Sequence, residues 1–443
     1  MLFGVPRLKR SLSVFLVSIL ASGLLVSCSS SSNSTQQTKS GLTFRAFVSN
    51  PLHLGPTGGI FPALQIVNAT TDVLSLAAVS LSGVLPDAGM MVVGPKKDRT
   101  LVVSPSSNRI AVVDNTSESV TTAISLPGAT ESLFVWTDDT SAFVAIPSAP
   151  VLGQPAGGVG RYNILTGVTT AIIPIPGAHY LVPSTTGNQI LVFSDNSDLV
   201  TLLFPGLLGT GSQTNTQVPC SGVPIAACTV SGFDRPVWGV FNGSGTTAYI
   251  FNCGLECGGS SNASIVPLNL GTQQPGTPIP LLNAGVVGGA TIGLLSGNFL
   301  YVAGTPPGTV CGTGTTALNC GVLSVVDIGS SSVTTAQLIP DGYHNRIQMG
   351  ANGQLFVGSH TCTNVTTATE TRGCLAIYDS VHSVVTVPPE NGDVTGIEPI
   401  PNRSVVYVCQ GGALQIYETA TDHLQTTQVN IVGQAVDVKV VDF

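Results

Sequence analysis

A short pattern recurs seven times along the chain and constrains its architecture more than any other feature. In each copy, apolar β-forming residues lead into Asp, Asn or Glu, then small polar residues, then a second β-rich run. The clearest copies are VVDNTSESVTTAI from Val112 and VVDIGSSSVTTAQL from Val325. A short acidic or amide side chain at such a position can accept hydrogen bonds from the backbone of a tight turn. The pattern therefore predicts hairpins with tips at Asn68, Asp114, Asn163, Asn269, Asp327, Asp379 and Glu418.

Hairpins repeated at this spacing are typical of β-propellers, in which four-stranded sheets stack as blades around an axis. Seven groups of strand-like segments begin near Met90, Ser132, Tyr180, Val237, Ala290, Arg346 and Val394. The N-terminal part holds three further strands, and the C-terminal AVDVKVVDF holds one. Together they would complete an eighth blade and remove exposed sheet edges. We therefore predict an all-β propeller of eight blades, closed by strands from both ends of the chain, with seven blades as the alternative.

The first residues predict a secretory leader rather than a membrane span. Arg7, Lys9 and Arg10 precede an apolar run from Leu12 to Leu25, which is too short to cross a bilayer and ends in small residues. We expect a signal peptide over residues 1–27, a Ser-rich flexible tether over 28–41 and one propeller domain over 42–443.

The end of the leader resembles the lipobox of bacterial lipoproteins. The residues concerned are Leu25-Val26-Ser27-Cys28. The resemblance implies that Cys28 is diacylated, becomes the new N-terminus and anchors the chain to a membrane. Ser29 after the cysteine favours the outer membrane, with the domain in the periplasm or on the cell surface. The alternative is an ordinary signal peptide in which this cysteine occurs by chance.

Composition argues against a nucleic-acid partner. Charged residues make up only 9% of the chain. Loss of the leader lowers the basic count from 15 to 12, against 23 acidic residues. An acidic surface without a Lys/Arg cluster lacks the cations that neutralise phosphates.

Eight cysteines fall into four close sequential pairs, Cys220/Cys228, Cys253/Cys257, Cys311/Cys320 and Cys362/Cys374. A structural zinc site would need tighter doublets or histidine partners at matching intervals. We therefore predict four local disulfides, which fit an oxidising cell envelope. Cys409 is left over and is expected to be a small buried core residue.

The repeats around Val112 and Val325 resemble the YVTN-type propeller repeats of bacterial surface and periplasmic proteins. The resemblance covers nearly the whole secreted chain, although the Tyr-Val-Thr-Asn string itself is absent. It implies the propeller fold. That fold carries lactonases, quinoprotein dehydrogenases and binding scaffolds alike. Trp136 and Trp238 are the only tryptophans, too few for a quinone-docking motif in many blades.

Common catalytic motifs are missing, and the candidate site rests on the axis of the propeller. The sequence contains no GxSxG, HExxH, GxxxxGK or EF-hand pattern. Loops that enter the inner strands of a propeller converge at the channel mouth. The ionisable residues predicted there are Glu131, His179, Asp234, Arg235, His344, Arg346, Asp393 and Glu398. They could hold a divalent metal of unknown identity or a polar ligand, or they could cap turns around a water-filled channel.

Three functions remain open from the sequence. The favoured one is an envelope-anchored binding or scaffold propeller for an unidentified protein, glycan or small ligand, without a resident cofactor. The alternative is a lactonase-like hydrolase that uses an axial site with His179 and His344. The third is a structural component of a larger surface assembly.

Overall fold

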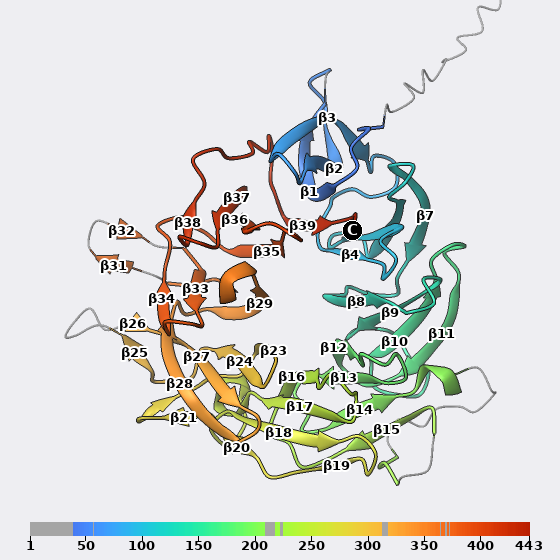
Figure 1. The fold of residues 1–443 in the computed structure, drawn as a ribbon. Coiled ribbons are helices and arrows are strands. Elements are labelled where there is room, and N and C mark those ends of the chain that lie inside the picture. Colours follow the sequence, from blue (N-terminus) through green and yellow to red (C-terminus); the bar gives the residue numbers. More distant parts are fainter. Residues whose placement is uncertain are drawn as a thin grey trace, which may run out of the picture. The chain divides into compact units, whose positions relative to one another are not determined.

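Eight antiparallel sheets form a β-propeller in the described part of a computed structural model, as the sequence predicts (Figure 1). The structure describes residues 39–55, 57–208, 218–221, 225–311, 318–363, 365–367, 370–371 and 373–443. The predicted leader, the lipidation site Cys28 and most of the tether lie outside these residues. Within them, we find no helix with the length and apolarity needed to span a bilayer.

The inner strand of each blade faces the axis, and each inner strand contacts the next around a closed ring. In ring order they are β39 (Asp437–Val440), β4 (Met91–Val93), β8 (Ser132–Val135), β12 (Ala178–Pro183), β16 (Pro236–Phe241), β23 (Ile292–Ser296), β29 (Tyr343–Met349) and β35 (Val394–Pro399).

Three strands continue each blade outward. The second strands are β1 (Arg45–Leu54), β5 (Arg99–Ser104), β9 (Ser141–Ile146), β13 (Ile190–Ser194), β17 (Thr247–Asn252), β24 (Phe299–Gly304), β30 (Gln354–His360) and β36 (Val405–Gln410). The third strands are β2 (Ile60–Asn68), β6 (Arg109–Asp114), β10 (Gly158–Asn163), β14 (Val200–Leu203), β18 (Ser264–Asn269), β27 (Gly321–Asp327), β33 (Leu375–Asp379) and β37 (Ala413–Glu418). The outer strands are β3 (Val73–Ser80), β7 (Ser119–Ser125), β11 (Thr169–Pro174), β15 (Ala227–Val230), β19 (Gln274–Pro275) with β20 (Ile279–Pro280), β28 (Ser332–Ile339), β34 (Val384–Thr386) and β38 (His423–Leu424).

Short elements decorate this frame. They are the hairpins β21 (Leu282–Asn283) with β22 (Val286–Val287), β25 (Val310–Cys311) with β26 (Leu318–Asn319), and β31 (Val365–Thr367) with β32 (Glu370–Thr371), and the 3₁₀ turns η1 (Pro205–Leu207), η2 (Gly254–Cys257) and η4 (Ala351–Gly353).

One blade combines both ends of the described chain and is here called the closing blade. Its sheet order is β3-β2-β1-β39, as the sequence predicts. The C-terminal β39 pairs antiparallel with β1, with Ala46 opposite Val440 and Ser49 opposite Asp437. No exposed edge is left at the inner side of this blade, because the partner strand arrives from the far end of the chain.

The recurring sequence pattern forms the turn between the third and outer strands. In six copies the pivot side chain accepts a backbone N–H of the turn, for example Asn68 Oδ1 from Thr70 at 2.9 Å and Asp327 Oδ1 from Gly329 at 2.9 Å. The residue four places after each pivot has a positive φ. These residues are Asp72, Glu118, Gly167, Gln273, Ser331, Ser383 and Asp422. Only one of the seven is glycine, so this turn places ordinary L-residues in the left-handed region.

Two arginine–carboxylate pairs with buried carboxylates join the closing blade to both of its neighbours. Arg45 on β1 reaches Glu118 in the next blade, and Nη1 lies 2.7 Å from Oε1. On the other side, Arg403 of the preceding blade binds Asp72 of the closing blade, and the Tyr407 hydroxyl also donates to Asp72. Both carboxylates occupy the left-handed position of their turns. The turn conformation therefore aims an acid at the arginine of the preceding blade.

The hydrophobic core lies between neighbouring blades rather than at one centre. At the boundary of the closing blade, Val48 and Val438 pack with Tyr407, Cys409 and Ile416 of the preceding blade. All five are fully buried. Cys409 is free and buried, as predicted.

The disulfide prediction is confirmed where the structure describes both sulfurs. Bonds join Cys220 to Cys228, Cys253 to Cys257, and Cys362 to Cys374. Cys320 is also disulfide-bonded, whereas the side chain of its predicted partner Cys311 lies outside the described residues. Such bonds are typical of an oxidising compartment outside the cytoplasm.

Candidate functional site

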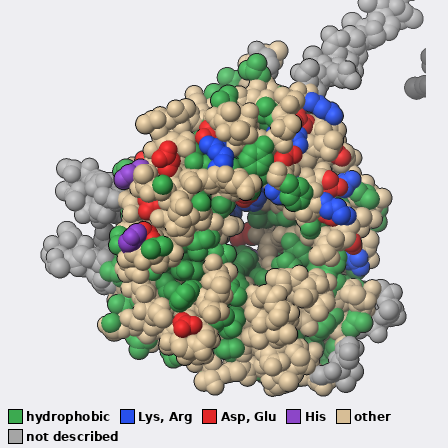
Figure 2. Space-filling view, viewed as in Figure 1, with side chains coloured by type: hydrophobic (Ala, Val, Ile, Leu, Met, Phe, Trp, Pro, Cys, Tyr) green, Lys and Arg blue, Asp and Glu red, His purple; other side chains and the backbone are tan. Residues whose placement is uncertain are grey.

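A cavity of about 520 Å³ occupies the axis of the ring. Figure 2 shows the ring hollowed at its centre, with hydrophobic side chains around the opening. The charged and aromatic residues of the wall, with one histidine, are Glu131, Tyr180, Trp238, Tyr343, Arg346 and His360. Cavities of this size, with a largely apolar wall and a few convergent polar groups, are typical of small-molecule sites.

A β-bulge near the start of four inner strands aims side chains at this cavity. The pairing register shifts just before Tyr180 on β12, Trp238 on β16, Arg346 on β29 and Gly396 on β35. A bulge bends its strand and reorients the next side chain. Tyr180, Trp238 and Arg346 line the cavity, whereas Gly396 does not. A regular alternation of buried and exposed residues therefore does not predict them.

One wall of the cavity carries a carboxylate beside a histidine. The Nε2 atom of His179 lies 3.4 Å from Oε2 of Glu131, and its Nδ1 lies 2.6 Å from Oδ1 of Asp195. The hydrogen bond to His179 is the main reason that the pKa of Glu131 is lowered; burial opposes it, and the charge of Arg346 adds to it. Burial opposes protonation of His179, but its two carboxylate partners outweigh burial and raise its pKa. Glu131 is therefore ionised at neutral pH.

Aromatic rings lie between the two walls. The Tyr180 ring stacks on the His179 ring at 4.1 Å and meets the Trp238 ring edge-on at 5.8 Å. Its hydroxyl lies 2.7 Å from the hydroxyl of Tyr343, which belongs to a blade three places further around the ring. Burial raises the pKa of both tyrosines, so both stay neutral. This tyrosine pair also borders a second cavity of about 190 Å³, which is lined by His179, Asp195 and Arg235.

The facing wall carries Arg346 and His360. The guanidinium of Arg346 donates to two backbone carbonyls, from Nε to Thr395 at 2.8 Å and from Nη1 to Asn345 at 2.9 Å. Burial, followed by the charge of Arg346, lowers the pKa of His360, which is therefore neutral at pH 7. Its Nε2 atom is buried without a hydrogen-bond partner in the described structure.

The other predicted site residues are not part of this cavity. Asp234 caps a turn by accepting the N–H groups of Ser260 and Ser261. Arg235 lies with its Nε 3.9 Å from Asp198 and faces the second cavity.

The Glu398 side chain is 20% exposed, with a carboxylate oxygen 3.7 Å from Nζ of Lys439. Burial raises its pKa. Its other oxygen accepts the backbone N–H of Val440 at 3.1 Å. These contacts join the inner strands of two neighbouring blades, so Glu398 takes part in packing the closing blade.

His344 differs most from its predicted position at the channel mouth. It is 1% exposed, and its Nε2 lies 3.0 Å from the carbonyl oxygen of Pro340. It precedes the bulge of β29, so its side chain points into the blade boundary. His179 and His344 therefore do not meet. Among the described residues, no three His, Cys, Asp or Glu side chains are grouped closely enough to hold a metal ion.

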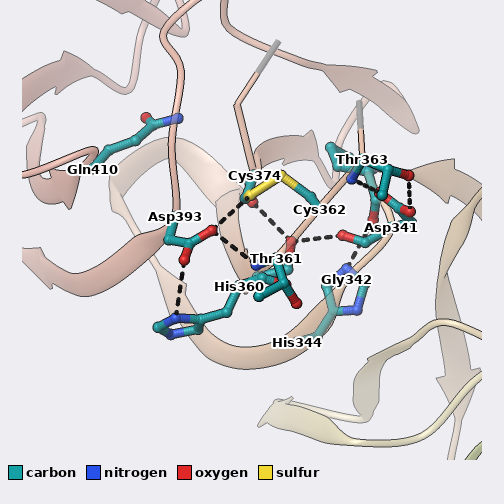
Figure 3. The surroundings of a disulfide bond; sticks show 12 residues. Asp341, Gly342, His344, His360, Thr361, Cys362, Thr363, Cys374, Asp393 and Gln410 are labelled. Carbon is teal, nitrogen blue, oxygen red and sulfur yellow. Dashed lines mark hydrogen bonds and ion pairs between the residues drawn. A yellow bond between two sulfur atoms is a disulfide. The ribbon is translucent and has the colours of Figure 1, made fainter. Parts of the chain in front are cut away.

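Asp393 supports the wall next to His360 (Figure 3). One oxygen accepts the Thr361 backbone N–H at 2.8 Å, and the other lies 3.8 Å from Nδ1 of His360. On the far side, Asp341 accepts the N–H of Thr363 at 2.7 Å. The Cys362–Cys374 disulfide crosses between these contacts. The bond and the two carboxylates thus fix the segment that follows His360.

No family model matches this sequence, and no curated protein matches it. Solved structures, in contrast, match this chain. Dihydro-heme d1 dehydrogenase NirN in complex with DHE has a TM-score of 0.60 at 12% identity, covering 90% of this chain and 75% of that one. These values show the β-propeller fold alone. A functionally unknown protein from Desulfotomaculum acetoxidans gives 0.49 at 12% identity, covering 90% of this chain and 99% of that one. Kuenenia stuttgartiensis hydrazine synthase gives 0.41 at 12% identity, covering 74% and 76%.

Proposed function

We propose that this protein is an envelope-anchored β-propeller that binds a small ligand in its axial cavity. The observation that carries the proposal is the wall of that cavity, where three aromatic rings lie between an ionised carboxylate and a guanidinium. Aromatic surfaces contribute apolar contact area, and a few fixed polar groups orient a ligand. The hydrolytic alternative relied on His179 and His344 acting together, and these residues lie apart.

Trp238 provides a direct test of ligand binding. It borders the cavity, whereas the only other tryptophan, Trp136, packs against Phe134 and Phe143. In a Trp136→Phe variant, all tryptophan emission comes from Trp238. We expect its emission to change saturably when the purified domain is titrated with at least one class among amino acids, sugars, nucleosides and aromatic acids. The matched variant Trp238→Phe, which keeps Trp136, should stay silent. No response to any class at millimolar concentration would contradict the proposal.

Lipid anchoring at Cys28 is the second part of the proposal. It is supported by the leader and the tetrad that resembles a lipobox, and by disulfides that fit an extracytoplasmic compartment. Two or more acyl chains would hold the protein stably at a membrane. In a Gram-negative host, we expect labelled palmitate to enter the wild type and the protein to sediment with the outer membrane. Cys28→Ser should lose both properties, whereas the matched change Ser29→Ala should keep the label. Label on the Cys28→Ser variant would overturn the assignment.

A further inference from the structure

We propose that the axial cavity recognises a zwitterion, a small molecule that carries one cationic and one anionic group on a partly apolar body; this inference rests on the proposed function. The cavity presents a carboxylate and a guanidinium on facing walls, with aromatic rings between them. The argument starts from Arg346.

Arg346 is a cation at the cavity wall, and no anionic side chain among the described residues contacts it. Within the described residues, no carboxylate lies within 4.0 Å of its guanidinium; the described partners are the carbonyls of Thr395 and Asn345. Neutral carbonyls fix the orientation of the side chain but place no negative charge in contact with it. A planar guanidinium held in this way suits a carboxylate, which it can bind through two parallel hydrogen bonds. The wall around Arg346 is therefore prepared for an anionic group.

Glu131 supplies the opposite charge on the other side of the ring. It immediately precedes β8, and β8 lies four places from β29 in the ring of eight inner strands, so the two strands face each other across the axis. The Glu131 side chain is 72% exposed and can be reached by a ligand. His179 lies between two carboxylates, Glu131 and Asp195, and can balance at most one of their charges. One negative charge thus remains on this wall.

Tyr180, Trp238 and Tyr343 lie between these two charges. Aromatic rings attract a cation and pack against an apolar body. An ammonium beside Glu131 would contact this aromatic region, and a carboxylate would reach toward Arg346. A ligand with only one charge would satisfy one wall and leave the other without a partner. Since desolvation of an uncompensated charge is costly, opposed charges favour a ligand that carries both.

The experiment uses the W136F protein and compares each amino acid with two derivatives that differ only in charge. The N-acetyl derivative keeps the carboxylate and loses the cation, whereas the methyl ester keeps the cation and loses the carboxylate. Glycine betaine serves as a zwitterion with a quaternary ammonium. We expect at least one zwitterion to bind about tenfold or more tightly than both of its derivatives, as measured by Trp238 emission.

Two variants assign the charges to the walls. Arg346→Met should weaken zwitterion binding by about tenfold or more and leave methyl-ester binding unchanged, because the ester has no carboxylate. Glu131→Gln should weaken zwitterion binding and leave the N-acetyl derivative unchanged. Arg346→Lys keeps the charge and should bind with intermediate affinity. The matched controls Arg109→Met and Glu418→Gln remove the same charges away from the cavity and should bind as the parent does. Thermal melting confirms that each variant is folded.

The outcomes separate this inference from the proposed function. Zwitterion binding that is equal to that of both derivatives, or unaffected by either variant, overturns the zwitterion assignment. Binding of a sugar or nucleoside without any response to zwitterions does the same, while it supports a ligand site at Trp238. If the Trp238 emission does not change with any class of compound, both proposals are wrong.

Discussion

Replacing Arg45 with alanine is expected to lower the free energy of unfolding by about 3–5 kcal/mol, because it leaves two carboxylates without their buried partner. The Arg45 residue is only 8% exposed. Its Nη2 and Nε atoms bind the Asp442 carboxylate at 2.7 and 2.8 Å, and its Nη1 binds Glu118 at 2.7 Å. Nη1 also donates to the carbonyl of Asn115 at 2.7 Å. One side chain therefore joins the first strand, the last residues of the chain and the next blade.

The measurement is equilibrium unfolding in urea, with Arg99→Ala as the matched control. Arg99 also forms a short ion pair, with Nη1 2.5 Å from Asp98, but this pair is partly exposed. Exposed pairs contribute roughly 0–1 kcal/mol. The two variants remove the same charge, but Arg99 is more exposed and pairs with one carboxylate instead of two. Equal losses of stability in both variants would show that Arg45 does not hold the ring closed.

A second large effect is expected at His344, in the pH dependence of stability. Burial lowers the pKa of this histidine from 6.5 to about 4, although the Pro340 carbonyl and the charge of Asp341 oppose the change. Because the unfolded chain takes up the proton first, the contribution of His344 to stability is present above pH 6.5 and is lost as the pH falls toward 4. At 1.36 kcal/mol per pKa unit, the loss at pH 4 is about 3 kcal/mol.

Comparison with a His344→Gln variant isolates this contribution. Glutamine can still donate to the Pro340 carbonyl, but it does not titrate. Other buried groups act with the opposite sign: burial raises the pKa of Glu256 to about 7, so acid relieves the cost of keeping this carboxylate ionised. The pH dependence of the wild-type unfolding free energy contains the effects of both His344 and Glu256. We therefore expect the difference in unfolding free energy between wild type and variant to shrink by about 3 kcal/mol from pH 7 to pH 4. If the unfolding free energies of wild type and His344→Gln change in parallel with pH, His344 is not the titrating group.

Much of the fold could be predicted from local sequence, because each blade repeats the same turn chemistry. The pivots such as Asp114 and Asp327 accept turn N–H groups as expected, and the leftover strands at both ends combine in the closing blade. The cysteine pairs are close in sequence, which made their bonding predictable. The pattern did not reveal the left-handed conformation four places after each pivot. It also did not reveal that Asp72 and Glu118, at this position, bind arginines far away in the chain.

The candidate site was only partly accessible to the same reasoning. Glu131 and Arg346 were predicted near the axis because ionisable residues are scarce and both lie at inner strands, and both line the cavity. Tyr180, Trp238, Tyr343 and His360 were missed, since aromatic residues in a strand more often belong to the core. The bulges decide which side chain faces the axis, and a bulge depends on pairing between strands. His344 was misplaced for this reason: it lies two residues before Arg346, but the bulge between them sends the two side chains to different surroundings.

The closing blade also sets the order in which the molecule can be completed. During synthesis β1 emerges before the other strands, whereas its partner β39 emerges only after Asp437. Until then, the inner edge of β1 offers unpaired backbone groups to any other extended chain. Contacts across this seam join residues nearly 400 positions apart, and such distant pairing makes folding slow. The growing chain therefore has an open sheet edge until β39 arrives, and other extended chains can pair with that edge during this interval.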